Sequence, residues 1–89
     1  MTIFDDYIAR CRSLIVALQG ILPLADLQMA THLIDHGEAP EGMRALAWAI
    51  VDGNVLVAAE VVAQIREYAD DIIDKSDMPE NLESFILVL

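Results

Sequence analysis

Apolar residues recur every three or four positions along most of this chain, which is the spacing of one face of an α-helix. Glycine, proline and asparagine interrupt the pattern at short intervals, and no useful stretch alternates apolar and polar residues as a half-buried strand does. Each uninterrupted segment therefore predicts one helix. The predicted helices cover residues 4–19, 23–36, 40–52, 58–75 and 79–87.

Each predicted helix carries one apolar stripe that we expect to face a shared core. The expected core residues are Tyr7, Ile8, Cys11, Leu14, Ile15, Leu18, Leu24, Leu27, Ala30, Leu33, Ile34, Met43, Leu46, Ala47, Ile50, Val51, Val61, Val62, Ile65, Ala69, Ile72, Ile73, Leu82, Phe85 and Ile86. Stripes joined by short turns predict an all-α fold. We expect one domain over residues 1–89, a compact antiparallel helical bundle of four main helices plus a short C-terminal helix.

Residues with known preferences for helix ends support these boundaries. Thr2 is suited to cap the first helix, and Gly20 suits the left-handed position that ends it. Gly37 closes the second helix. Asp77 followed by Glu80 three residues later has the form of a capping box, which predicts the start of the last helix.

The segment 54–57, Asn-Val-Leu-Val, is apolar but too short to predict a helix. Two interpretations stay open for it, a loop tucked against the core or a brief extended stretch. In either case it joins the third and fourth predicted helices.

The composition shows more apolar residues than a small core needs. Of 89 residues, 56% are hydrophobic, and the mean hydropathy is +0.47. A domain of this size has little interior, so part of the apolar surface is expected to lie in an interface. A membrane span does not explain the excess, because the longest uncharged stretch, residues 13–25, is shorter than the roughly 20 residues required.

The N-terminal residues and the cysteine content favour a cytoplasmic protein. The chain begins with acids at positions 5 and 6, where a secretory signal would be basic. Cys11 is the only cysteine in the sequence, so it has no partner for a disulfide within the chain.

The net charge of −10 is the other strong feature of the composition. Residues 1–45 hold six acids and three arginines, a net −3, whereas residues 46–89 hold nine acids, Arg66 and Lys75, a net −7. Direct binding to nucleic acid is disfavoured, because it needs basic residues to displace counterions from phosphate. Such a field favours a basic partner, although the acids could also serve only to keep an apolar domain soluble.

Four of the acids gather on the fourth predicted helix. Glu67, Asp70, Asp71 and Asp74 follow one another at steps of three, one and three, which places them on one side of the helix, away from its apolar stripe. This set is either an ordinary solvated face or a docking surface for lysines and arginines of a partner. Its spacing is not that of a calcium-binding loop.

Trp48 is the most suggestive single residue. It lies on the flank of the apolar stripe of the third predicted helix, with Arg44 one turn earlier on the same flank. Tryptophan and arginine are enriched among the residues that dominate binding energy in interfaces. The alternative is that Trp48 is covered by the fourth helix or by Val55 and Leu56. We therefore predict a partner-binding role for Trp48 and Arg44 together with the four acids.

Evidence for catalysis is much weaker. His32 and His36 are four residues apart on one helix, as in some zinc sites, but no third ligand is specified by the sequence. Cys11 lies in an apolar stripe, where burial makes a thiol unreactive. The sequence shows no phosphate-binding glycine loop and no triad spacing. We expect neither an enzyme nor a bound cofactor or metal.

Three segments resemble the MafI-type immunity proteins of bacterial polymorphic toxin systems. They are residues 33–38 (LIDHGE), residues 45–50 (ALAWAI), and Glu60 with Ile65 on the following helix. The resemblance covers roughly residues 27–70. It implies a small acidic helical protein that binds and neutralises a cognate toxin, typically a nuclease.

The resemblance and the charge lead to one functional expectation. Nucleases bind nucleic acid and tend to be basic, so an acidic inhibitor can occlude their surface. The main alternative is a homodimeric helical interaction module, such as an adaptor or accessory subunit, which also explains the apolar excess. A small metal-dependent enzyme centred on His32 and His36 is a third, weaker interpretation.

Overall fold

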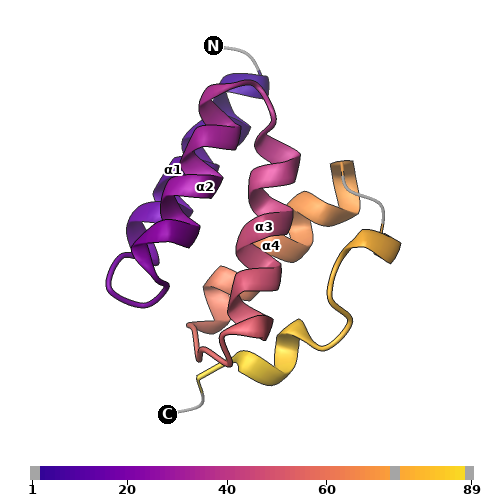
Figure 1. Ribbon diagram of the computed structural model, residues 1–89. Coiled ribbons are helices and arrows are strands. Elements are labelled where there is room, and N and C mark those ends of the chain that lie inside the picture. The colour runs from indigo at the N-terminus through magenta and orange to yellow at the C-terminus, as the bar shows by residue number, and fades with distance from the viewer. Residues whose placement is uncertain (1–2, 73–74, 88–89) are drawn as a thin grey trace.

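The computed structural model describes residues 3–72 and 75–87 of the chain. Its four α-helices are α1 (Ile3–Ala17), α2 (Leu24–Asp35), α3 (Ala39–Asp52) and α4 (Ala59–Ile72). Two short 3-10 helices follow, η1 (Lys75–Asp77) and η2 (Leu82–Phe85). Figure 1 shows α1 and α2 side by side, α3 next to α2, and α4 crossing behind α3. The predicted all-α bundle of four main helices is confirmed.

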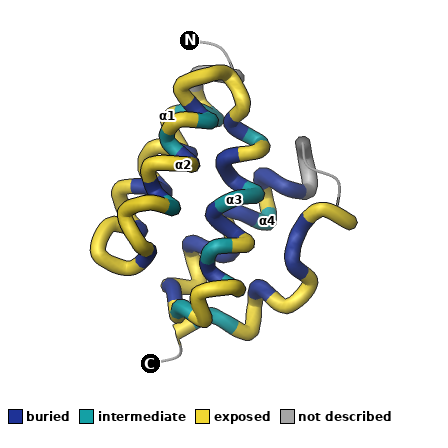
Figure 2. The backbone as a smooth tube through the Cα atoms, in the orientation of Figure 1, coloured by how far each residue is buried: buried dark blue, intermediate teal, exposed yellow. Residues whose placement is uncertain are grey.

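Helix α3 is the centre of the fold. Its buried residues are Ala39, Gly42, Met43, Leu46, Ala47 and Ile50. In Figure 2 buried positions recur along α3, whereas much of α1 and α2 is exposed. The apolar stripes of α1 and α4 complete one continuous core around α3, as the sequence pattern predicts.

Helices α2 and α3 approach each other closely because small residues line their contact. A Cβ atom added at Gly42 would lie 3.1 Å from the carbonyl oxygen of Ala30 and 3.2 Å from Cγ1 of Ile34. Glycine at this position thus lets one backbone pack directly on the other.

The turns before and after α2 depend on two glycines. Gly20 has φ +80° and Gly37 has φ +79°, in the left-handed region that L-residues with a Cβ atom rarely adopt. The predicted left-handed conformation is confirmed at both glycines, although α1 ends at Ala17 and not directly before Gly20. The predicted cap Thr2 lies outside the described residues.

The segment after α4, which we call the strap (residues 75–87), returns along the molecule towards the start of α4 (Figure 1). The N–H of Val57 donates to the Phe85 carbonyl at 2.8 Å, and the N–H of Leu87 donates to the Val57 carbonyl at 2.7 Å. Val57 thus forms an isolated bridge to Ile86, is 1% exposed, and follows Val55, which packs against the core. The segment 54–57 is a loop tucked against the core that is extended only at its last residue.

Arg66 on α4 holds the middle of the strap. Its Nε donates to Glu83 at 2.6 Å and its Nη2 donates to the other Glu83 carboxylate oxygen at 2.7 Å. The same Nη2 donates to the carbonyl of Pro79 at 2.9 Å. These hydrogen bonds keep the pKa of Glu83 below its ordinary value.

The C-terminal helix is shorter than predicted. The expected helix 79–87 is reduced to η2, which starts at Leu82 and has no side-chain cap, so the capping box predicted at Asp77 and Glu80 is wrong. The physical reason is competition for backbone carbonyls. Those of residues 77 and 79 accept hydrogen bonds from the side chains of Trp48 and Arg66 instead of from a helix.

Leu24 is the clearest error among the predicted core residues. It is 69% exposed, although its spacing places it on the stripe with Leu27 and Ile34, which are buried. Leu24 is the first residue of α2. At the outer end of the α1–α2 pair, no further element packs over it among the described residues. Leu33, another predicted core residue of α2, is only half-buried.

Candidate functional site

Trp48 lies on α3 beside the strap, with 41% of its surface exposed. Its indole N–H donates a hydrogen bond of 2.9 Å to the carbonyl oxygen of Asp77. This bond ties the ring to the strap, an element that neither interpretation from the sequence included. The bond fixes the orientation of a large aromatic side chain that still presents nearly half of its surface to solvent.

Arg44 lies one turn before Trp48 on α3 and is half-exposed. Its guanidinium group forms an ion pair with Glu41 on the same helix. Asp52, one turn after Trp48, is exposed. The flank around the indole therefore holds Asp52 and the strap residue Asp77, together with an arginine whose charge is matched by Glu41.

The other arginines are matched in the same way. Arg10 pairs with Glu67 at 3.6 Å, Arg12 with Asp35 at 2.8 Å, and Arg66 with Glu83 at 2.6 Å. All four arginines of the sequence are thus engaged with carboxylates of the same chain. These exposed pairs contribute little stability individually, but they leave a surface on which carboxylates predominate.

The acidic face predicted on α4 is described only in part. Glu67 is 66% exposed and points towards Arg10 of α1. Asp70 and Asp71 belong to α4, but their side chains lie outside the described part of the structure, as does residue 74 altogether. Of the residues whose side chains are described, Glu67 pairs with Arg10 of α1 and Trp48 binds the strap, so these two lie in different surroundings.

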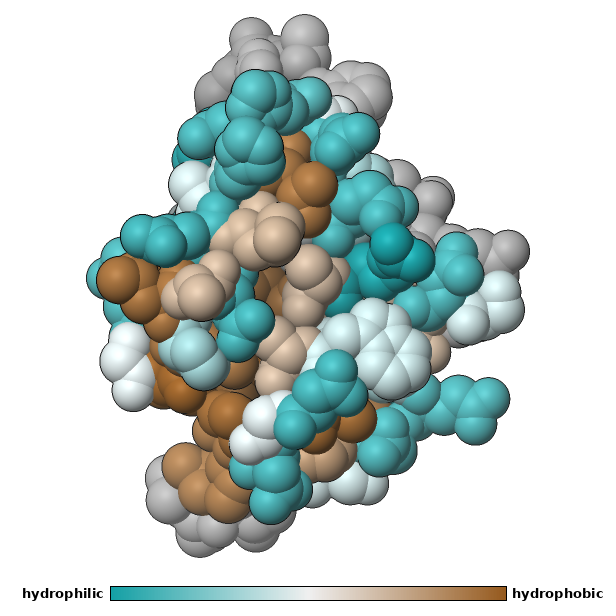
Figure 3. All heavy atoms as spheres, viewed as in Figure 1, coloured by the Kyte–Doolittle hydropathy of each residue, from teal (hydrophilic) through white to brown (hydrophobic). Residues whose placement is uncertain are grey.

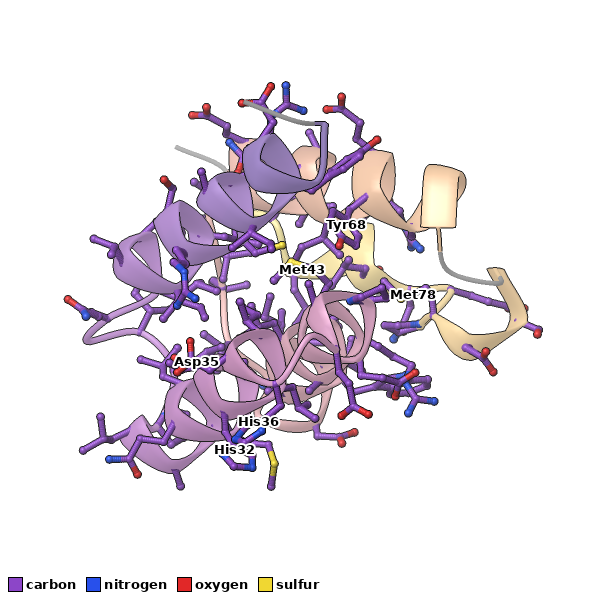
Figure 4. All side chains as sticks on the ribbon, turned by 90° about the horizontal axis from the view of Figure 1, so that it is seen from above. His32, Asp35, His36, Met43, Tyr68 and Met78 are labelled. Carbon is purple, nitrogen blue, oxygen red and sulfur yellow. The ribbon has the colours of Figure 1, made fainter. Side chains whose placement is uncertain are left out.

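His32 and His36 stack on one side of α2, with ring centroids 4.2 Å apart. Figure 4 shows the two rings side by side, whereas Asp35 points away from them towards α1, where it pairs with Arg12. Among the described residues, no group of three or more His, Cys, Asp or Glu side chains is arranged to hold a metal ion. The pair of histidines is therefore a surface feature of α2 in this structure.

Cys11 lies at a cavity of about 250 Å³ between α1 and α4, whose lining includes Tyr7, Leu14, Met43 and Tyr68. The two tyrosine rings meet edge to face, with centroids 5.1 Å apart. Cys11 is 1% exposed, and burial raises the pKa of its thiol despite a hydrogen bond with Tyr68. Figure 4 shows Tyr68 and Met43 pointing into this region between the helices. The predicted inert core cysteine fits this environment.

Burial also raises the pKa of Tyr68 to about 12, with a further contribution from Cys11. The unfolded chain loses this phenolic proton near pH 10, whereas the folded chain retains it up to about pH 12. The stabilisation is therefore complete below pH 10 and is lost as the pH rises through this window.

We expect ultraviolet absorbance at alkaline pH to reveal this phenol directly. Phenolate absorbance from Tyr68 should appear only near pH 12, and the free energy of unfolding should fall by roughly 2–3 kcal/mol between pH 10 and 12. In Tyr68→Phe the late absorbance step should vanish. If that step persisted in the variant, Tyr68 would not be the buried phenol.

The sequence did not reveal an apolar groove between the ends of α1 and α2. Its large apolar lining residues are Ile15, Leu22, Leu24 and Leu27, and its volume is about 680 Å³. The polar side chains of its lining are Gln19, Gln28, Thr31, His32 and Asp35. The adjoining residues Val16 and Ile21 are 63% and 43% exposed. The one available signal was the uncharged run 13–25, which indicates apolar surface but not whether it faces inward or outward.

Apolar surface also extends over the face that α2 and α3 share. In Figure 3 it forms a band across these helices, bordered by hydrophilic side chains. Met29 on α2 is 57% exposed, and Ala45 and Ala49 on α3 are half-buried. Within the described residues, no helix combines the length and the hydropathy needed to cross a bilayer.

Comparison with known protein families, with curated proteins and with solved structures found no match to this chain.

Proposed function

We propose that this chain is a binding protein that captures a basic partner protein, in the manner of an immunity protein that neutralises a nuclease toxin. The observation that carries the proposal is the charge of the surface. No charged side chain is buried among the described residues, and each arginine is already paired with a carboxylate. The acids that the structure describes are therefore available to an approaching cationic surface, and the chain as a whole has a net charge of −10.

Trp48 supplies the second element of the proposal, an anchor of fixed geometry. An aromatic side chain that is half-exposed and already oriented loses little conformational freedom on binding. The hydrogen bond to the Asp77 carbonyl provides that orientation. Asp52 and Asp77 beside the ring would meet lysines or arginines of the partner at the rim of the interface.

The surface charge and Trp48 act on different steps of binding, association and dissociation. Long-range attraction between the acidic chain and a basic toxin speeds their encounter and is weakened by salt. Burial of the indole then slows dissociation, because apolar contacts at the centre of an interface contribute most of the affinity. Occlusion of the nucleic-acid-binding surface of the toxin follows from the size of the bound domain.

The test is binding to a basic nuclease encoded beside the gene for this chain. We expect Trp48→Ala to weaken binding by about 30-fold or more, mainly through faster dissociation. Asp52→Lys and Asp77→Lys should slow association several-fold, with a smaller effect at high salt. Leu56→Ala is the matched control, because Leu56 is an exposed apolar residue, 53% exposed, outside this surface.

The same assay separates the two predicted surfaces. Reversal of Glu67, Asp70, Asp71 and Asp74 to lysine, one at a time, tests the face of α4. If these four variants lost affinity and Trp48→Ala did not, the binding surface would be the α4 face. Unchanged affinity in every variant of both sets would refute the acidic-docking proposal.

A further inference from the structure

We infer that the groove between the ends of α1 and α2 is an interface for a second copy of this chain. The groove combines the most exposed large apolar side chain reported in the structure, Leu24 at 69%, with a concave lining of Ile15, Leu22 and Leu27. Val16, which follows the lining residue Ile15 on α1, is 63% exposed. Exposed apolar side chains next to an apolar groove are unusual on the surface of a monomer and mark an association site.

Charge distinguishes the occupant of this groove. Residues 12–35 supply the whole surface, and their charged side chains are Arg12, Asp26 and Asp35, a net −1 out of −10. Arg12 and Asp35 neutralise each other at 2.8 Å. A basic partner would therefore gain little by docking here, whereas the remaining surface carries a net −9 that would attract it.

For a second copy of the chain, the low charge of the groove is an advantage. Two molecules with a net charge of −10 repel each other, so they associate with least cost through their least charged surface. The α1–α2 surface, with a net charge of −1 over residues 12–35, meets that condition. The structure thus gives separate sites to the two kinds of partner.

The shape of the site suits a two-fold symmetric contact. In such an interface the same patch is used on both molecules, so an exposed side chain of one copy must fit a groove of the other. Leu24 is the exposed side chain of the lining, and Ile15, Leu22 and Leu27 form the more deeply buried apolar part of the groove. One chain therefore carries both features that a symmetric contact requires, an exposed apolar side chain and a groove.

Sedimentation velocity over a dilution series tests the inference. We expect the 9.8 kDa chain to form a reversible dimer, and amide shifts on dilution to be confined to residues 15–35. Leu24→Asp should weaken dimerisation by at least about 100-fold, because two buried leucine side chains are lost per symmetric dimer. Leu24 is the first residue of α2, where an acid favours the helix, so the variant is expected to fold.

Leu56→Asp is the matched control, because Leu56 has a similar exposure of 53% and lies outside the groove. High salt should preserve or strengthen the dimer, since it screens the repulsion between acidic chains. A chain that stays monomeric at about 1 mM would overturn the inference. So would equal losses in Leu24→Asp and Leu56→Asp, or a dimer dissolved by salt.

Nuclease binding by Leu24→Asp tests dimerisation independently of the proposed function. Leu24→Asp should retain full affinity for the basic nuclease, because Trp48 and the acids lie outside the groove. If Leu24→Asp instead abolished nuclease binding, the groove would be the partner's site and self-association through it would be refuted.

Discussion

Leu46→Ala is expected to lower the free energy of unfolding by about 3–4 kcal/mol, since truncation leaves a cavity among packed side chains. Leu46 has 0% exposure at the centre of α3, the helix that contacts every other part of the core. For a domain of 89 residues, the total stability is of the order of 5–10 kcal/mol. The loss would therefore remove a large part of it.

Urea denaturation followed by circular dichroism measures this effect, and Leu24→Ala is its control. The sequence pattern assigns both leucines to apolar stripes, but Leu24 is 69% exposed. Its truncation should cost less than about 0.5 kcal/mol in the monomer. Similar losses in the two variants would show that Leu24 is buried and that the arrangement of α1 and α2 described above is wrong.

Gly42→Leu is expected to have an effect of similar size through overpacking. Even a Cβ atom at this position would lie 3.1 Å from the Ala30 carbonyl oxygen. A leucine side chain has no room unless α2 and α3 move apart. The expected cost is about 3 kcal/mol, at the upper end of the range for overpacked cores.

Gly42→Ala provides the comparison that isolates packing from helix propensity. Alanine favours a helix over glycine by about 1 kcal/mol, which offsets the tight contact of one added carbon. We therefore expect a change near zero for alanine and a large loss for leucine in the same urea titration. If leucine were tolerated as well as alanine, α2 and α3 would not be packed backbone to backbone.

The helical stripes made most of the fold predictable from the sequence. Local spacing decides whether a segment is a helix and which of its faces is apolar, so Leu27, Met43 and Ile65 were placed correctly. It does not show where an element overhangs its neighbours. Leu24 continues the apolar stripe of α2 beyond the part of the helix that α1 and α3 cover. Its spacing therefore predicts a core residue, but its side chain is exposed.

The strap shows a second limit of local pattern. Asp77, Pro79 and Glu80 have the residue types of a helix start, but their segment is shaped by Trp48 and Arg66, which lie far away in the sequence. Hydrogen bonds from those two side chains occupy the carbonyls of residues 77 and 79. Contacts between distant residues overrode the local signal, as they do wherever short helices lack stability of their own.

The candidate binding residues were identified by type, and the structure added their surroundings. Trp48 was expected on the flank of its helix, but its bond to the strap and its 41% exposure follow only from the fold. The ion pairs that engage Arg10, Arg12 and Arg66 join different elements, so no spacing in the sequence reveals them. Because each of these arginines is matched by a carboxylate, the remaining acids determine the charge of the surface.

The proposal that this acidic domain binds and occludes a basic nuclease can be tested directly. The measurement is a titration of the nuclease encoded beside its gene with the unmodified chain, following nucleic-acid cleavage and binding together. We expect cleavage to fall to zero at one chain per nuclease, with an affinity that weakens as salt is added. Full cleavage in the presence of excess chain, with no complex at low salt, would contradict it.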